Sequence, residues 1–232
     1  MKCVVTIDGP AAAGKSTVAR GLADRLGWCF LDTGAMYRAA TLAAVRAGVD
    51  LSDEAALSTL VESLSVTLLP DRVLLGEEDV TELIRGVDVT RASRFTADSP
   101  SVRGRLTIWQ REIAAQNNVV TEGRDQGTLV FPDAFRKYYL TASDEERASR
   151  RLAEYLARGE SVSFESVLRD QRERDARDAA RSIAPMKPAT DAVVIDSTGM
   201  SVVDVIDRMA HEIRARLAEA PYLFATASEP TS

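Results

Sequence analysis

The chain contains 232 residues with a formal net charge of −6, and 28% of the residues are charged. This length allows one α/β domain with a small insertion. The acidic balance argues against a nucleic-acid-binding surface, which requires a basic footprint, and the sequence has no apolar run of membrane-spanning length.

The first predicted elements surround the most specific pattern in the chain. Gly9-Pro10-Ala11-Ala12-Ala13-Gly14-Lys15-Ser16 fits G-x-x-x-x-G-K-[ST] at every fixed position. An apolar, β-branched run at 3–7 predicts a buried strand before the pattern. Residues 16–26 predict a helix after it, with one apolar face formed by Val18, Leu22 and Leu26. This strand–loop–helix context distinguishes a phosphate-binding loop from an ordinary glycine-rich turn.

Such a loop has a defined chemistry. Its backbone N–H groups and the N-terminus of the following helix form a nest for phosphate oxygens. The Lys15 side chain would reach the β- and γ-phosphates, and the Ser16 hydroxyl would ligate Mg²⁺. The sequence therefore predicts a nucleoside triphosphate site.

The next predicted elements are a strand, two helices and a hairpin. A strand at 28–31 ends in Asp32-Thr33-Gly34, a helix runs through Tyr37 to Ala47, and Ser52 caps a second helix that ends near Leu64. Two apolar runs at 66–69 and 72–75, joined by Pro70-Asp71, predict a small antiparallel hairpin. We therefore expect residues 65–97 to form an insertion that stands off the main sheet.

The remaining chain alternates strands with helices. Helices are predicted from Ser99-Pro100 to Asn117, from a capping box of Ser143 and Glu146 to Gly159, and from Ser201 to Leu217. Strands are predicted at 119–121, 138–140 and 192–195. This alternation predicts a three-layer α/β/α fold around a five-stranded parallel sheet. The core would comprise residues 1–64 and 98–220, and the aperiodic tail at 221–232 would be disordered.

A charged segment at 164–181 is open to two interpretations. Ion pairs at helical spacing, such as Asp170 with Arg174 and Asp178 with neighbouring arginines, are typical of a solvated helix. The same arginines could instead belong to a mobile lid that closes over phosphates and excludes water. The spacing alone favours neither interpretation.

A phosphate-binding loop does not by itself identify an activity. The sequence has no Asn-Lys-x-Asp motif, which argues against a guanine-reading GTPase. Arginines recur beside the predicted loops, at Arg38, Arg103 and Arg124, and again within the charged segment. A donor nucleotide needs few of them, so they indicate a second, anionic substrate. Phosphoryl transfer depends mainly on such positioning and charge neutralisation.

Four motifs, in this order, carry a resemblance to a known family. They are GPAAAGKST at 9–17, DTGAMYR at 32–38, EGRDQGT at 122–128 and ERDARD at 173–178. Together they resemble the bacterial cytidylate kinases, which are nucleoside monophosphate kinases, over about residues 3–217. The hairpin insertion is similar to the enlarged monophosphate-binding region of that family. The charged segment, at about 161–188, is similar to its lid.

The resemblance implies a reaction and a set of site residues. ATP with Mg²⁺ would donate a phosphoryl group to CMP, with dCMP as a second acceptor. The ATP site would comprise Gly9, Pro10, Ala11, Ala12, Ala13, Gly14, Lys15, Ser16 and Thr17, with Mg²⁺ on Ser16. The cytosine base would contact Thr33, Arg103 and Asp125, and the ribose would contact Ser93, Arg174 and Asp178. The acceptor phosphate would be held by Arg38, Arg124 and Arg181, which with Lys15 would be the catalytic residues.

The chemistry of cytosine supports part of this assignment. A carboxylate accepts from the exocyclic amine of cytosine, and a guanidinium donates to the ring N3 and O2. Uracil carries a carbonyl in place of the amine, so Asp125 together with Arg103 would favour cytosine. The alternative for Asp125 is a structural ion pair with Arg124.

The residues alone leave two other functions open. The acceptor could be UMP or another small phosphorylated metabolite. The protein could also be a nucleotide-gated switch that hydrolyses ATP, although the arginine-rich acceptor set argues against that function.

The cellular setting is predicted from the cysteines and the chain start. Cys3 and Cys29 lie in apolar runs without paired spacing, which predicts two buried, reduced thiols. Met1-Lys2 leads directly into the first strand, so no signal peptide is predicted. We expect a cytoplasmic monomer with small-molecule substrates and no nucleic-acid or membrane partner.

Overall fold

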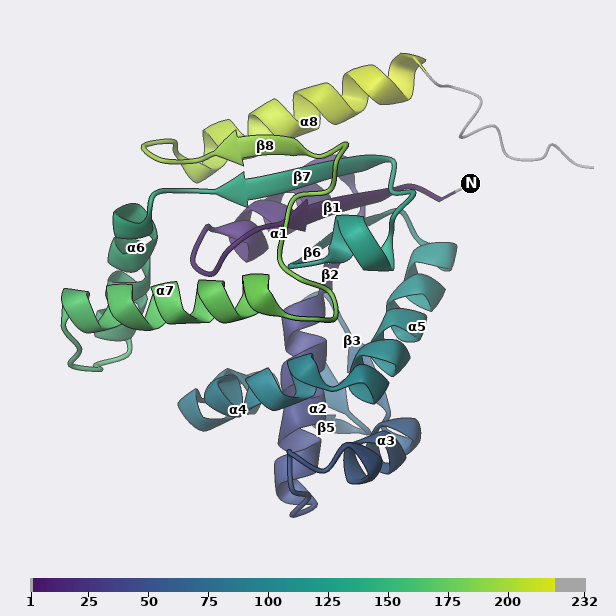
Figure 1. The fold of residues 1–232 in the computed structure, drawn as a ribbon. Coiled ribbons are helices and arrows are strands. Elements are labelled where there is room, and N and C mark those ends of the chain that lie inside the picture. Colours follow the sequence, from purple (N-terminus) through teal and green to yellow (C-terminus); the bar gives the residue numbers. More distant parts are fainter. Residues whose placement is uncertain (1, 220–232) are drawn as a thin grey trace, which may run out of the picture.

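The computed structural model of the protein describes residues 2–219 (Figure 1). The tail predicted to be disordered at 221–232 therefore lies outside the described residues. No helix within the described part of the chain is both long and apolar enough to cross a membrane.

A parallel sheet of five strands forms the centre of the fold, as predicted. Its order is β2-β6-β1-β7-β8. The strands are β1 Val4–Asp8, β2 Cys29–Asp32, β6 Val119–Gly123, β7 Arg136–Thr141 and β8 Val193–Asp196. Because all neighbouring strands are parallel, their carboxyl ends lie at one edge of the sheet. Asp8 pairs there with Gly123, and Asp32 pairs with Glu122.

Helices cover both faces of the sheet, which confirms the three-layer architecture. Helices α1 (Lys15–Leu26) and α8 (Val202–Glu219) pack on one face, where Leu22 and Met209 are fully buried. Helix α5 (Pro100–Gln116) packs on the other face through Leu106. Along β6, Val120 belongs to the first core cluster and Val119 to the second, as the alternation of a strand requires.

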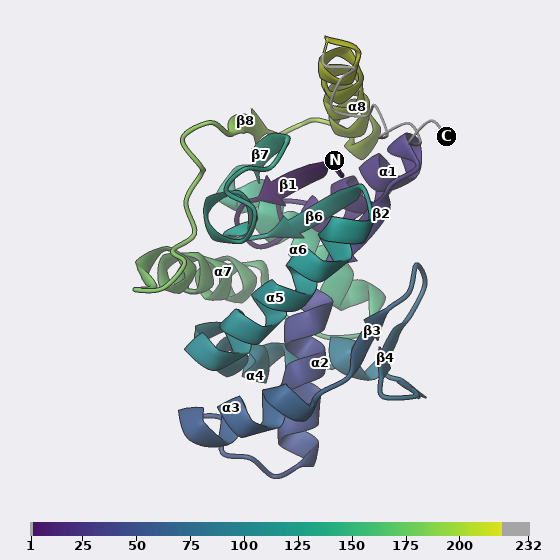
Figure 2. The same ribbon diagram turned by 90° about the vertical axis from the view of Figure 1, so that its right-hand side faces the viewer.

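A second group of elements lies beside the sheet (Figure 2). It contains helices α2 (Thr33–Arg46), α3 (Glu54–Ser63) and α4 (Val87–Asp98), and a small sheet of β3 (Val66–Leu68), β4 (Val73–Leu75) and β5 (Glu78–Asp79). The predicted antiparallel hairpin is confirmed as β3 and β4. Strand β5 and helix α4 were not predicted, because β5 is two acidic residues and the apolar residues Val87 and Phe95 of α4 are exposed rather than on one buried face. In α4 only Val89 and Thr96 are buried.

The caps of the helices test the sequence analysis in detail. Ser99 caps α5 by accepting from Val102 N, as predicted. The predicted cap of α3 at Ser52 was wrong: Asp53 Oδ1 accepts from the first-turn N–H groups, and the Ser52 hydroxyl donates to Asp50 instead. A carboxylate at the N-cap also interacts favourably with the helix dipole.

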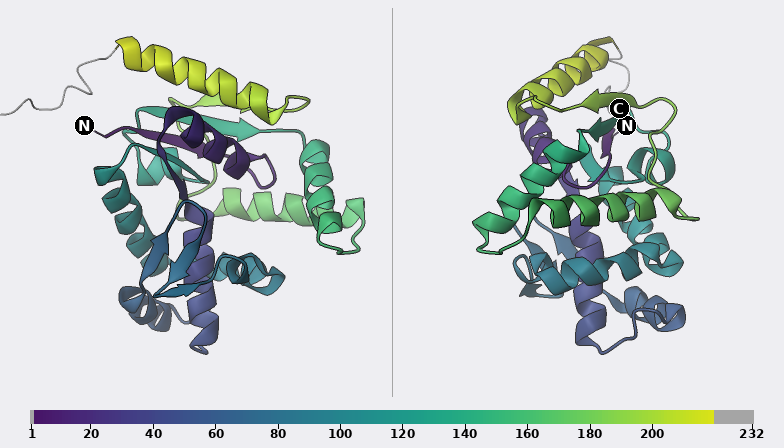
Figure 3. Two further views of the ribbon diagram at one scale, coloured as in Figure 1. Left: turned by 180° about the vertical axis from the view of Figure 1, so that it is seen from behind. Right: turned by 60° about the vertical axis from the view of Figure 1, so that its left-hand side comes forward.

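Helices α6 (Asp144–Ala157) and α7 (Phe164–Ala180) follow β7 and lie at the carboxyl edge of the sheet (Figure 3). The Ser143 hydroxyl accepts from Glu146 N, which confirms half of the predicted capping box. The other half differs, because Ser143 N donates to Thr198 Oγ1 and Glu146 pairs with Arg150.

The two cysteines are free, but only Cys3 is buried. The prediction of a buried thiol was wrong for Cys29. Strand β2 is an edge strand and Cys29 is its first residue, so its side chain meets solvent despite its apolar neighbours.

Candidate active site

The phosphate loop connects β1 to α1 at the carboxyl edge. Gly9 adopts φ 145°, and a Cβ added there would lie 2.0 Å from Leu140 O in β7. Only glycine allows this approach. Gly14 adopts φ 84° and caps α1, while Ala12 adopts φ 57°, which is strained for a residue with a Cβ. The predicted strand–loop–helix context is therefore present.

Lys15 and Ser16 start helix α1 beside this loop. Lys15 is buried and its Nζ donates to Pro10 O at 2.7 Å. Burial, together with the positive charge of Arg124, lowers the pKa of Lys15 to about 7. The Ser16 hydroxyl donates to Glu122 Oε1 at 2.9 Å. The next residue, Thr17, is exposed in the first turn of the helix.

Three carboxylates, Asp8, Asp32 and Glu122, lie at the ends of β1, β2 and β6 and were not predicted as site residues. Asp8 accepts from Gln126 N and Gly127 N at 2.9 and 2.7 Å, and burial raises its pKa to about 6 despite these bonds. Asp32 caps α2 by accepting from Ala35 N; burial and the charge of Glu122 raise its pKa. Their position in the sequence could have identified them, since each carboxylate directly follows a predicted strand.

Arg103 and Asp125 form a buried ion pair between α5 and the end of β6. Their side chains are 8% and 7% exposed. Burial raises the pKa of Asp125, although the charge of Arg103 opposes this shift. The alternative pairing of Asp125 with Arg124 was wrong, because the partner is Arg103. Thr33, the third residue predicted to meet the base, donates to Glu122 O at 2.7 Å.

A chain of ion pairs links α7 to the sheet and to α4. Asp178 accepts from Arg124 Nε at 3.0 Å and pairs with Arg181 at 2.8 Å. Arg181 also pairs with Asp98 at 2.7 Å. The pair with Arg181 has the predicted helical spacing, whereas the pair with Arg124 was not predicted. Burial and the positive charge of Arg124 lower the pKa of Arg174 to about 10.

One predicted ion pair of the arginine-rich segment was wrong, while the roles predicted for Ser93 and Arg38 stay predictions. Asp170 pairs with Arg169 rather than with Arg174. Ser93 donates to Thr90 O within α4 and makes no hydrogen bond to another predicted site residue among the described residues. Arg38 lies 3.7 Å from Asp32, and its buried Nε has no hydrogen-bond partner within residues 2–219.

The arrangement suits two polyanionic ligands that react with each other. The phosphate loop and Lys15 form one side of the site, and Asp178 and Arg181 at the carboxyl end of α7 form the other. Arg124 connects the two sides, since it pairs with Asp178 and lowers the pKa of Lys15. Such a site can align two phosphate groups and neutralise the charge between them.

Comparisons with known proteins agree with this chemistry. The family model described as "Cytidylate kinase" matches residues 5–215. A cytidylate kinase of Carboxydothermus hydrogenoformans is 46% identical over 209 residues, which cover 88% of this chain and 94% of the relative. A cytidylate kinase of Pelotomaculum thermopropionicum is 48% identical over 216 residues, covering 91% of this chain and 96% of the relative.

The likeness to a solved structure concerns the fold alone. The crystal structure of an uncharacterized protein from Eubacterium ventriosum superposes with a TM-score of 0.53 at 14% identity. The match covers 93% of this chain and 99% of that chain. With the family model matching most of its length and relatives near 46% identity, the chain belongs to the cytidylate kinase family.

Proposed function

We propose that the protein transfers the γ-phosphoryl group of ATP to CMP, and also to dCMP, giving ADP and CDP or dCDP. The observation that carries the proposal is the buried Arg103–Asp125 pair, which lies beside the end of β6. Its donor and acceptor groups match the N3, O2 and amine of cytosine. Relatives named cytidylate kinase support the same acceptor.

The mechanism requires no strong base, because the attacking oxygen belongs to an already ionised phosphate. The phosphate loop would hold the donor through its backbone N–H groups. Lys15 would then place a positive charge against the transferred group, and Arg38, Arg124 and Arg181 would hold the acceptor phosphate. Fixed charges of this kind stabilise the charge that develops during transfer.

Mg²⁺ fits the oxygen donors at the start of α1. The Ser16 hydroxyl lies at 2.9 Å from Glu122, and Asp32 is close enough to Glu122 for the two charges to interact. Mg²⁺ is held in such sites by one or two side-chain oxygens together with substrate phosphates and water. When bound, it would neutralise phosphate charge. No cluster of three or more His, Cys, Asp or Glu side chains suited to a metal occurs among residues 2–219, so phosphate oxygens would complete the coordination.

Two segments would move around this centre. We assign acceptor binding to the insertion at 65–97, together with Thr33 and Arg38 of the neighbouring helix α2. The lid would comprise about 161–188, which contains α7. Arg174 and Asp178 of that helix would meet the ribose. Ser93, in the insertion, keeps its proposed ribose contact on the resemblance alone, since its hydroxyl is occupied within α4.

The proposed activity is tested by coupled ADP release with CMP, dCMP, UMP, AMP and GMP as acceptors. ADP release should require an added monophosphate, with CMP and dCMP the best. A preference for UMP would support another pyrimidine kinase. ADP release that is independent of any acceptor would support the nucleotide-gated switch.

Replacement of Asp125 should relax the choice of base. Asp125→Ala should raise the KM for CMP and reduce the ratio of kcat/KM between CMP and UMP by about 10-fold or more. The reason is that UMP no longer places a carbonyl against the carboxylate, a mismatch worth roughly 1–3 kcal/mol. Steady-state kinetics with both acceptors measure this ratio.

The control for Asp125 must separate specificity from stability. Removing one partner of a buried ion pair leaves Arg103 uncompensated and costs about 3–5 kcal/mol of folding free energy. Asp125→Asn retains an acceptor oxygen beside Arg103, so it should fold better and keep part of the discrimination. An unchanged CMP/UMP ratio in folded Asp125→Ala would show that this residue does not select the base.

Replacement of Asp178 should discriminate between the two sugars. The carboxylate can accept from a ribose 2′-hydroxyl, which dCMP lacks. Asp178→Ala should therefore reduce kcat/KM for CMP more than for dCMP, by about 10-fold for one charged hydrogen bond. Asp170→Ala, an exposed replacement in the same helix, should leave both values unchanged. Equal losses for CMP and dCMP would assign Asp178 to its ion pairs with Arg124 and Arg181 only.

A further inference from the structure

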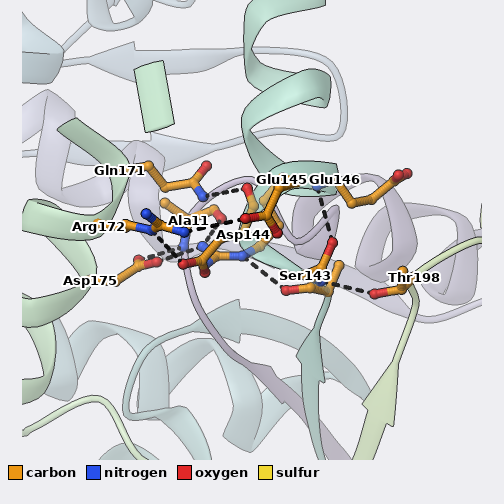
Figure 4. Close-up of polar contacts among 11 residues, drawn as sticks. Ala11, Ser143, Asp144, Glu145, Glu146, Gln171, Arg172, Asp175 and Thr198 are labelled. Atoms are coloured by element: carbon orange, nitrogen blue, oxygen red, sulfur yellow. Dashed lines mark hydrogen bonds and ion pairs between the residues drawn. The ribbon is translucent and has the colours of Figure 1, made fainter. Parts of the chain in front are cut away.

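One acidic residue of α7 contacts the phosphate loop directly. Asp175 Oδ1 accepts from Ala11 N at 3.2 Å (Figure 4). Asp175 Oδ2 accepts from Arg147 NH1 at 2.5 Å. The same NH1 group donates to Ala11 O at 2.9 Å. Both backbone polar groups of Ala11 are thus bound by side chains from outside the loop. We call this set, formed by Asp175, Arg147 and the backbone of Ala11, the loop clamp.

Arg147 is fixed on the side away from the loop as well. It is only 4% exposed, and its Nε donates to Ala142 O at 3.1 Å. Its NH2 group donates to Asp144 Oδ1 at 2.6 Å, in the first turn of α6. A guanidinium held by four acceptors in a rigid fork has little freedom to turn. The position of Ala11 is therefore tied to the start of α6.

The loop needs such external support because it offers little of its own. Residues Ala11, Ala12 and Ala13 have no polar side chain that could hold a turn. Ala12 also adopts φ 57°, a left-handed conformation that residues with a Cβ rarely adopt. A strained loop persists only where its surroundings determine it. The loop clamp fixes the backbone of Ala11, which is the residue next to the strained Ala12.

Helix α7 presents different residues to the two substrate sides. Gln171 and Arg172 contact the start of α6, and Asp175 contacts the loop. Asp178, three residues after Asp175 and therefore on the same face of the helix, is bound to Arg124 at the end of β6. The helix thus joins the phosphate loop to the side chains proposed for the acceptor.

We propose that Asp175 is a positioning residue for the phosphoryl donor. Through the loop clamp it holds Ala11 in the phosphate-binding conformation, so that ATP binding depends on the docking of α7. The inference rests on the proposed use of ATP, and Asp175 itself touches no substrate. Ala11, Ala12 and Ala13 have no polar side chains, and the polar contacts that the loop therefore lacks are supplied by α6 and α7.

The test compares ATP binding, without CMP, in wild type and Asp175→Ala by titration calorimetry. The dissociation constant for ATP should rise about tenfold, the loss of one charged hydrogen bond. In steady-state assays the KM for ATP should rise likewise, while the KM for CMP should change less than twofold. Asp170→Ala is the matched control, because Asp170 lies in the same helix and, within residues 2–219, its one ion pair is with Arg169. It should leave both KM values unchanged.

A second pair of variants keeps the test decisive if Asp175→Ala folds poorly. Asp175→Asn keeps an oxygen for Ala11 N but loses the charge opposite Arg147, so ATP should bind about threefold more weakly. Arg147→Lys should weaken it similarly, and the double variant should be no weaker than the worse single one, because both act through one contact.

The opposite results would overturn the inference. Unchanged ATP affinity in the folded Asp175 variants would leave the contact with a role in packing only. Tighter ATP binding would show that Asp175 competes with the triphosphate for the loop. Failure of the wild type to bind ATP or to phosphorylate CMP would instead refute the proposed function, which makes the two failures distinguishable.

Discussion

Lys15→Ala should lower kcat by about 10²-fold or more while leaving the protein folded. The side chain lies beside the phosphate loop, buried, with its Nζ on Pro10 O. A preorganised positive charge that acts on the transferred group is typically worth ~3 kcal/mol or more in the transition state. Coupled ADP release at saturating ATP and CMP measures the loss.

The control is Lys187→Ala, which removes the same charge from an exposed position. It should leave kcat unchanged. Thermal melting of both variants separates catalysis from stability. If Lys15→Ala melted like the wild type and retained near-normal turnover, Lys15 would have no part in the chemistry.

The lowered pKa of Lys15 provides a second readout of its role. A pKa of about 7 in the free protein leaves the amine mostly neutral at about pH 8. Phosphates favour the charged form, so ATP binding should raise this pKa and take up close to one proton at that pH. ATP affinity should correspondingly fall as the pH rises above about 7. Calorimetry in buffers of different ionisation enthalpy measures the proton uptake, which Lys15→Ala should abolish.

The elements that the sequence predicted well are those specified by local patterns. The strand, loop and helix around Gly9 and Lys15 follow from turn chemistry and apolar periodicity within about 25 residues. The cap at Ser99 is equally local. The wrong cap at Ser52 shows the limit of such patterns: two adjacent residues can both cap a helix, and only the backbone geometry selects Asp53.

The site was harder to predict because its contacts join distant parts of the chain. The family resemblance pointed to Arg103 and Asp125, but their pairing depends on how α5 packs against β6. Asp175 and Ala11 are 164 positions apart, and no spacing in the sequence points from one to the other. Arg147 was likewise missed. Its neighbours Asp144 and Glu146 suggest only an ordinary ion-paired helix start, whereas its burial becomes evident only in three dimensions.

Arg181 is the residue from which we expect the largest effect on the acceptor. It follows the last turn of α7, and its guanidinium is 16% exposed between Asp98 and Asp178. These carboxylates hold it at the junction of α7 with α4. A phosphate bound there would gain a charge-assisted hydrogen bond, which is about twice as strong as a neutral one.

Arg181→Ala should therefore lower kcat/KM for CMP by about 10²-fold, while the dissociation constant for ATP without CMP changes less than twofold. The loss corresponds to the ~3 kcal/mol typical of one donor removed from a developing charge. Arg177→Ala is the matched control, since Arg177 is exposed in the same helix, and it should retain the wild-type kcat/KM.

Kinetics with CMP and calorimetry with ATP alone give the two quantities. A parallel loss of ATP affinity would mean that Arg181 acts by docking α7 as a whole, because the loop clamp at Asp175 depends on the same helix. A loss confined to CMP would place its effect on the acceptor phosphate rather than on the loop clamp.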